Sequence, residues 1–273
     1  MIFMIIHEYT KLKKTFFNKI YIIAILLNIL SSTMFAEIDF NLIAPFGYNF
    51  TFSDIKTTSA GTYYSLLTSK DSDYYEVGVQ SQIGYNFYTK NCIFKSISVM
   101  AEIGYQLFPM SMSYYGYNTK YITNNVLFHT LHLGLIQKFY VFDRLSFGIG
   151  GGVRIPFSAD IRKNNVEDPT GKSPFPINNG KYDYNYIKTL FDSRVIPYIK
   201  LTMDVYYFFN DFVSLIAGFY FTYSMDMKFN TDTLNLYFND EYYRNYSYSS
   251  IGVGLNIGLS IGRKGSNQIK RIE

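Results

Sequence analysis

The segment that decides the fold is Ser250–Gly262, whose sequence is SIGVGLNIGLSIG. Its apolar side chains occupy every second position from Ile251 to Ile261, and glycine, serine or asparagine stands at each position between them. Successive side chains of a β-strand point to opposite faces, so this period of two predicts a strand with one apolar and one polar face.

The same alternation occurs in seven earlier segments of the chain, which cover residues 39–52, 75–87, 96–107, 127–139, 145–158, 194–205 and 213–226. Short turns at 89–92, 141–144 and 209–211 join three pairs of segments. Long polar stretches rich in tyrosine follow the first, third, fifth and seventh segments. Hairpins with short links at one end and long links at the other predict an all-β, eight-stranded antiparallel up-and-down transmembrane β-barrel with both termini at the short-turn end.

The composition excludes two other classes of protein. Aromatic residues make up 19% of the 273 residues, through 28 Tyr and 25 Phe, while only 17% are charged. A soluble domain has about 25% charged residues. The mean hydropathy of -0.01 is too low for a bundle of membrane helices, and the aromatic content is too high for a disordered chain.

The first 36 residues have the three regions of a secretory signal peptide, in the usual order. An apolar run covers Tyr21–Leu30, and a cleavage-like end follows at Ser31–Ala36. The basic residues that precede the run are Lys11, Lys13, Lys14 and Lys19. We expect cleavage after Ala36, which leaves residues 37–262 as the barrel and 263–273 as a periplasmic tail. The alternative is a retained anchor, but a spanning helix needs about 20 apolar residues.

Charge and cysteine content limit the partners of the exported chain. The signal peptide holds four Lys and one Glu, so the net charge of +4 falls to +1 after cleavage. Nucleic acid is therefore not an expected partner, because phosphate binding requires a cluster of Lys and Arg on the mature surface. The single cysteine, Cys92, excludes an intrachain disulfide and is interpreted as a turn residue.

The apolar rows of the predicted strands are expected to face lipid. The alternative is a soluble, lipocalin-like carrier with these rows inside. Rows of Phe, Tyr, Leu, Ile and Val are too bulky for the lumen of an eight-stranded barrel. Aromatic residues beside the short turns, at 87–88, 139–142 and 206–209, predict an interfacial girdle. Pro45 lacks a ladder donor in the middle of the first segment, where we expect a bulge.

With this pattern the chain resembles the small eight-stranded outer-membrane barrels, such as the OmpA transmembrane domain, OmpX and the OmpW type. The resemblance covers residues 37–262. The last strand is also similar to the assembly signal of these proteins, with polar Ser250, then Gly252, then Leu255 and Ile257 at alternate positions. Such proteins usually end on an aromatic residue, whereas this chain continues to Glu273. The resemblance implies the bacterial outer membrane as location and its lipid as partner.

Eight charged residues fall on the rows expected to face the lumen, four of each sign: Glu76, Glu102, Lys138, Arg154, Arg194, Lys200, Asp204 and Asp226. Buried charges need partners. One interpretation is a salt-bridged network that fixes the barrel and blocks conduction. The other is a narrow selective pore lined by the same residues.

The sequence does not predict an enzyme, a cofactor or a metal site. Lipid A acyltransferases and deacylases, which resemble this barrel in size, use a rim histidine with serine or acidic partners. Here the barrel segments hold only His129 and His132, and a general base also needs an orienting partner. We expect His129 to be an interfacial polar residue and His132 to form hydrogen bonds in the lumen. An outer-leaflet lipid enzyme is the third functional alternative.

The long connections carry tyrosine clusters, which suit recognition because tyrosine offers a large amphipathic contact area. The contact candidates are Tyr114, Tyr115, Tyr117, Tyr184, Tyr186, Tyr242 and Tyr243. The alternative is that these residues extend the strands and pair with one another. The sequence therefore predicts a monomeric surface-exposed barrel with a structural or surface-interaction role toward an extracellular protein or small molecule. A narrow pore or a carrier for small solutes is the second interpretation.

Overall fold

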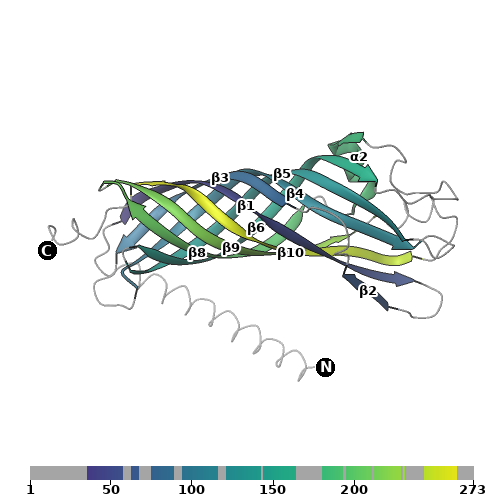
Figure 1. Ribbon diagram of the computed structural model, residues 1–273, viewed down its shortest axis with the longest axis horizontal. Helices are drawn as coiled ribbons and strands as arrows, with labels where there is room; N and C mark the ends of the chain where they lie inside the picture. Colours follow the sequence, from purple (N-terminus) through teal and green to yellow (C-terminus); the bar gives the residue numbers. More distant parts are fainter. Residues whose placement is uncertain are drawn as a thin grey trace, which may run out of the picture.

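The computed structural model describes residues 36–57, 63–67, 75–88, 94–115, 121–142, 144–163, 180–192, 195–210, 212–228, 230 and 243–262. The elements are β1 (Ala36–Thr57), β2 (Tyr63–Leu67), β3 (Tyr75–Tyr88), β4 (Ser96–Tyr115), β5 (Tyr121–Phe142), β6 (Leu145–Lys163), β7 (Gly180–Asp183), α2 (Tyr184–Leu190), β8 (Ile196–Phe208), β9 (Val213–Lys228) and β10 (Tyr243–Ile261) (Figure 1). The expected signal peptide and tail, residues 1–35 and 263–273, lie outside the described residues.

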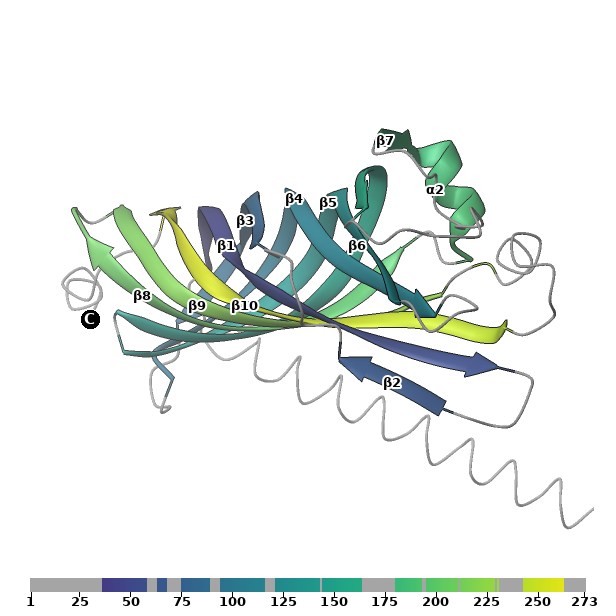
Figure 2. The same cartoon turned by 45° about the vertical axis from the view of Figure 1, so that its right-hand side comes forward.

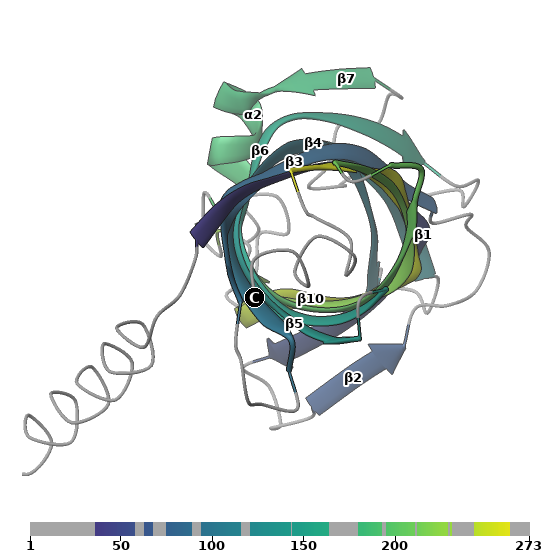
Figure 3. The same cartoon turned by 90° about the vertical axis from the view of Figure 1, so that its left-hand side faces the viewer.

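Eight of these strands close into an antiparallel barrel, which confirms the fold predicted from the alternation (Figure 3). The order around the barrel is β1, β3, β4, β5, β6, β8, β9 and β10, and β10 returns to pair with β1. The closing pair is continuous from Phe40 opposite Ile261 to Lys56 opposite Asn245. Closure gives each of the eight strands a neighbour on both sides, so the barrel has no edge strand.

The two faces of the wall differ as the alternation predicts. On β1, Leu42, Phe46 and Phe50 are exposed on the outside, while Asn41 and Asn49 are buried in the lumen. The outside is apolar around the whole barrel, because the other seven strands also expose large hydrophobic side chains there. Examples are Ile83, Ile103, Leu135, Ile149, Leu201, Phe219 and Ile257.

Pro45 does not form the expected bulge. The register of β1 against β3 is the same on both sides of it, since Ile43 is opposite Gln80 and Phe46 is opposite Val77. The two residues between them, Ala44 and Pro45, have no β3 partner, although Pro45 still lies opposite Asn256 of β10. The missing donor therefore interrupts one ladder without adding a residue to the strand.

The strands continue further at the long-connection end than the sequence predicts. β4 and β5 pair as far as Tyr115 opposite Tyr121, so only residues 116–120 connect them. β2 and β7 are short additional strands at the same end, which we call the upper end. β2 pairs with residues 52–56 of β1, and β7 pairs with residues 158–161 of β6 (Figure 2). Helix α2 follows β7 directly, and its N-cap Asp183 accepts a hydrogen bond from the Tyr186 backbone amide at 3.0 Å.

Apolar side chains fill both ends of the lumen. Near the short turns, Ile43, Tyr140, Tyr206 and Ile216 form one buried cluster, the lower plug. At the long-connection end, α2 contributes to a larger cluster, the upper plug. It comprises Phe108, Met110, Val126, Phe128, Ala159, Ile161, Ile187, Leu190, Phe191, Ile196, Met227 and Tyr248. Tyr140 and Tyr206 were expected in the aromatic girdle on the outside. Both occupy inward positions of their strands instead, and each is fully buried.

Across the described part of the chain, no helix is both long and apolar enough to span a membrane.

Candidate functional sites in the lumen and on the outer wall

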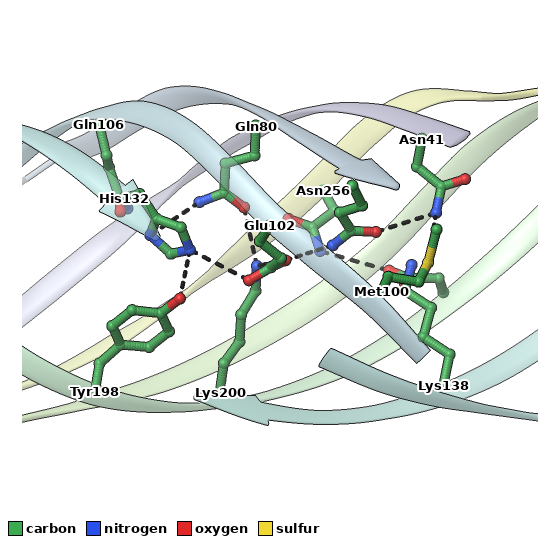
Figure 4. Close-up of polar contacts among 12 residues, drawn as sticks. Asn41, Gln80, Met100, Glu102, Gln106, His132, Lys138, Tyr198, Lys200 and Asn256 are labelled. Carbon is green, nitrogen blue, oxygen red and sulfur yellow. Dashed lines mark hydrogen bonds and ion pairs between the residues drawn. The ribbon is translucent and has the colours of Figure 1, made fainter. Parts of the chain in front are cut away.

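The centre of the lumen is organised around the Glu102 carboxylate (Figure 4). The Lys200 ammonium donates to Glu102 Oε2 at 2.9 Å and to Gln80 Oε1 at 2.9 Å. His132 Nε2 lies 3.2 Å from Glu102 Oε1 and 2.6 Å from the Tyr198 hydroxyl. Glu102 lies on β4 and Lys200 on β8, three strands away around the barrel. The pair therefore crosses the lumen rather than running along its wall.

A second ionic group lies between this centre and the lower plug. Lys138 Nζ contacts Asp204 Oδ2 at 3.0 Å and the Tyr206 hydroxyl at 3.3 Å, and both charged side chains are fully buried. The Tyr140 hydroxyl donates to Asp39 Oδ2 at 3.3 Å and lies 3.3 Å from the Tyr206 hydroxyl. These contacts join β1, β5 and β8, so polar and aromatic side chains again span the barrel.

Arg154 and Glu76 are buried without an opposite charge within 4 Å among the described residues. Arg154 donates to Gln106 Oε1 at 3.1 Å and to the Ser224 hydroxyl, and its guanidinium lies 4.6 Å from the Phe108 ring centroid. Glu76 accepts from the Tyr220 hydroxyl at 2.5 Å. Hydrogen bonds, and for Arg154 a cation–π contact, thus take the place of the salt bridges that one interpretation of the sequence predicts for these two groups.

The structure describes the side chains of only some of the predicted lumen charges. Six of the eight are buried in the lumen: Glu76, Glu102, Lys138, Arg154, Lys200 and Asp204. Arg194 lies outside the described residues, and so does the side chain of Asp226. A register shift in β9 puts Met227 opposite inward Tyr248, so the regular parity that placed Asp226 on the inward row does not extend to the end of this strand.

Tyr184 and Tyr186 lie on α2 rather than in an irregular loop. Tyr184 is exposed, whereas Tyr186 packs against the upper plug and its ring stacks 4.6 Å from that of Tyr182. Among the other contact candidates, Tyr114, Tyr115 and Tyr243 belong to extended strands, and their side chains are not among the described ones. Tyr117 and Tyr242 lie outside the described residues.

The outer wall carries a polar group that was not predicted from the sequence. His129 Nδ1 lies 2.5 Å from the Tyr105 hydroxyl, and His129 Nε2 lies 3.5 Å from Asp160 Oδ2. The side chains of His129 and Asp160 are each 23% exposed. A bulge in β6 builds this group, because Thr130 is opposite Pro156 but His129 is opposite Ser158. Phe157 is the extra residue, and it turns Asp160 outward.

Several lumen residues were missed because they are uncharged. Gln80, Gln82, Tyr198, Tyr206 and Tyr220 supply hydrogen bonds to the buried charges. The inward parity of each strand was the available signal for all five. Asp160 had no such signal, since the bulge reverses parity just before it. No three His, Cys, Asp or Glu side chains of the described segments gather closely enough to hold a metal ion.

No protein-family model and no curated protein sequence matches the chain. Among solved structures, the Yersinia pestis attachment invasion locus protein Ail is 8% identical, with a TM-score of 0.31 over 82% of this chain and 99% of that one. Neisserial surface protein A is 11% identical (TM-score 0.28; 80% and 96% covered), and the Escherichia coli outer membrane protease OmpT is 8% identical (TM-score 0.34; 83% and 96% covered). At these identities and TM-scores none of the likenesses carries a conclusion about function.

Proposed function

We propose that the chain is a monomeric outer-membrane β-barrel protein with a structural or surface-interaction role, and that its lumen is closed to solutes. The outward apolar face supports the membrane location, because a soluble monomer rarely exposes a contiguous apolar belt. A closed barrel also pairs its strands with one another all the way round, as a backbone exposed to lipid requires.

The observation that carries the closed lumen is the set of side-chain contacts across it. The lower plug, the Lys138–Asp204 pair, the Glu102–Lys200 pair and the upper plug follow one another along the barrel. An eight-stranded barrel has only enough interior for its own side chains. A chain closed in this way acts through its outer surface and its long-connection end.

The test is single-channel conductance of the refolded chain in planar bilayers. Folding is checked first by the heat-shifted gel mobility of a folded barrel. The proposal expects a silent bilayer. Steady ion-selective steps from folded protein would overturn the closed lumen and favour the pore.

A narrow pore is the second candidate, and one observation favours it. Buried polar atoms of Asn49, Asn86, Ser98, Thr222 and Ser250 have no hydrogen-bond partner among the residues that the structure describes. Such atoms are normally satisfied, and water is the remaining partner for a buried polar group. A lumen that holds water between its ionic groups has the polar lining of a selective pore.

The surface-interaction role rests on the long-connection end, where exposed Tyr184 stands beside the Tyr182–Tyr186 stack. Its test is adhesion of cells displaying the chain to immobilised matrix proteins and glycans. Tyr184→Ala is expected to weaken adhesion, because it removes an exposed aromatic anchor. Tyr85→Ala, which removes an exposed tyrosine from the outer wall of β3, is the control. Equal adhesion of all three chains, or none, would contradict this role.

A further inference from the structure

The polar group on the outer wall joins three neighbouring strands near the upper edge of the apolar belt. Tyr105 is on β4, His129 on β5 and Asp160 on β6. Ten residues separate His129 from Phe139, which lies beside the short turn. A tilted strand crosses a membrane in about 9–11 residues. If Phe139 marks one interface, His129 therefore lies at the other, where the polar headgroups of lipids meet their acyl chains.

A β-bulge in β6, which interrupts the regular alternation of the strand, brings this group together. If β6 alternated regularly through Phe157 without the bulge, Asp160 would point into the lumen and Ala159 would face outward. The bulge instead buries Ala159 in the upper plug and sets Asp160 beside His129. Bulges are frequent next to active sites, where they redirect a side chain. Within the described residues, His129–Asp160 is the only histidine–carboxylate pair on the outer wall, since His132–Glu102 lies in the lumen.

The hydrogen bonds have the order of an acid–base relay. Asp160 contacts one imidazole nitrogen of His129, and the other nitrogen contacts the Tyr105 hydroxyl. A carboxylate in this position orients the ring and stabilises the imidazolium form. The histidine is then the base that removes a proton from the hydroxyl, and tyrosine is among the side chains that serve as enzyme nucleophiles. Tyr105 is 41% exposed on the outer wall, so its hydroxyl is open to membrane lipid.

We propose that Tyr105, His129 and Asp160 form a site that hydrolyses carboxylic esters of membrane lipids. Tyr105 is the nucleophile, His129 the general base and acid, and Asp160 a positioning residue. Acyl ester groups are the electrophiles that lie at the depth of this site. The inference goes beyond the proposed structural and surface role and does not depend on a closed or open lumen.

The reaction has two balanced steps. In the first, His129 Nδ1 takes the phenol proton while the Tyr105 oxygen attacks the ester carbonyl carbon. The bond from this carbon to the lipid alcohol breaks, and the alcohol leaves with the proton from His129. In the second step, water attacks the acyl-tyrosine ester in the same way. This restores the Tyr105 hydroxyl and releases the fatty acid.

The experiment uses the full chain folded in phosphatidylcholine vesicles and in detergent with 4-nitrophenyl laurate. Fatty acid or 4-nitrophenol release above the protein-free rate is expected. Tyr105→Phe keeps the ring and removes only the hydroxyl, so it should lower the rate at least about 100-fold. The matched control is Tyr85→Phe on the same wall, which should leave the rate unchanged. Mass spectrometry after rapid acid quench should find an acyl group on Tyr105.

The test of Asp160 must distinguish a positioning role in the reaction from a contribution to folding. Asp160→Asn should lower the rate at least about 10-fold at unchanged gel mobility, and Asp160→Glu should restore most of it. No ester release by the folded wild-type chain would overturn the inference, and so would release that Tyr105→Phe leaves intact. Neither result bears on the conductance test, so the two proposals fail separately.

Discussion

Lys200 shows how a charged residue is accommodated in this lumen. Its ammonium is buried, and it contacts one carboxylate and one amide oxygen, both at 2.9 Å. Breaking such a pair costs more than its formation contributes, because the remaining charge stays buried without compensation. Without Lys200, Glu102 would still contact His132, but the imidazole ring of His132 carries a positive charge only when it is protonated.

Lys200→Met should therefore destabilise the folded barrel by about 3–5 kcal/mol. The measurement is the free energy of unfolding from reversible urea titration in vesicles. Lys181→Met removes an exposed ammonium from β7 and serves as the control, with an expected change within about 0.5 kcal/mol. An equal effect of the two substitutions would show that Glu102 does not depend on its ion pair.

Gly134 provides the space that the Tyr198 side chain occupies. A Cβ at position 134 would lie 2.3 Å from the Tyr198 hydroxyl oxygen. Gly134→Ala must therefore displace the hydroxyl from His132, at a cost of about 1–3 kcal/mol. Tyr198→Phe removes the clashing oxygen, so the double variant should be more stable than the sum of the single effects by about 0.5–3 kcal/mol. Strict additivity in the same urea titration would contradict this packing.

Much of the lumen can be predicted from strand parity. Alternation alone turns Glu102, Lys138 and Lys200 inward, and the structure has them there. Their partners are not predictable in this way. The contact of Glu102 with Lys200 depends on how β4 and β8 face each other once the barrel closes, and alternation within a strand contains no information on that.

At the scale of the elements, the bulges in β6 and β9 decide which face the later side chains of these strands reach. In β6 the extra residue Phe157 moves Ala159 inward and Asp160 outward. In β9 a shift between Ser224 and Met227 similarly places Met227 in the lumen. A one-residue slip exchanges the faces of all later residues in a strand. The strands were predictable from their alternation, whereas these slips have no mark in a single sequence.

The β6 bulge can be tested with a pair of cysteines in a Cys92→Ser background. Ala159 is 1% exposed, while the Asp160 side chain is 23% exposed. A water-soluble thiol reagent should therefore label Asp160→Cys in folded vesicles and leave Ala159→Cys unlabelled until urea unfolds the barrel. The reverse pattern would mean that β6 keeps a regular register.

For the whole molecule, closure is layered rather than due to a single constriction. The lower plug, the two ionic groups and the upper plug each contain contacts between strands that are not neighbours. Removing one layer leaves the others in place. The proposed closed state is therefore expected to tolerate local substitutions that a barrel with one gate would not.

The conductance of variants that lack one or two of these layers tests this expectation. Tyr140→Ala with Tyr206→Ala removes two large rings from the lower plug and should leave the bilayer silent, because the Glu102–Lys200 pair still crosses the lumen. Adding Glu102→Ala and Lys200→Ala removes the central crossing together with both of its charges, so no buried charge of this pair remains uncompensated. This fourfold variant should also stay silent, because the Lys138–Asp204 pair and the upper plug still cross the lumen. A conducting double variant would instead identify the lower plug as the single gate. Gel mobility before each recording separates a silent folded barrel from an unfolded chain.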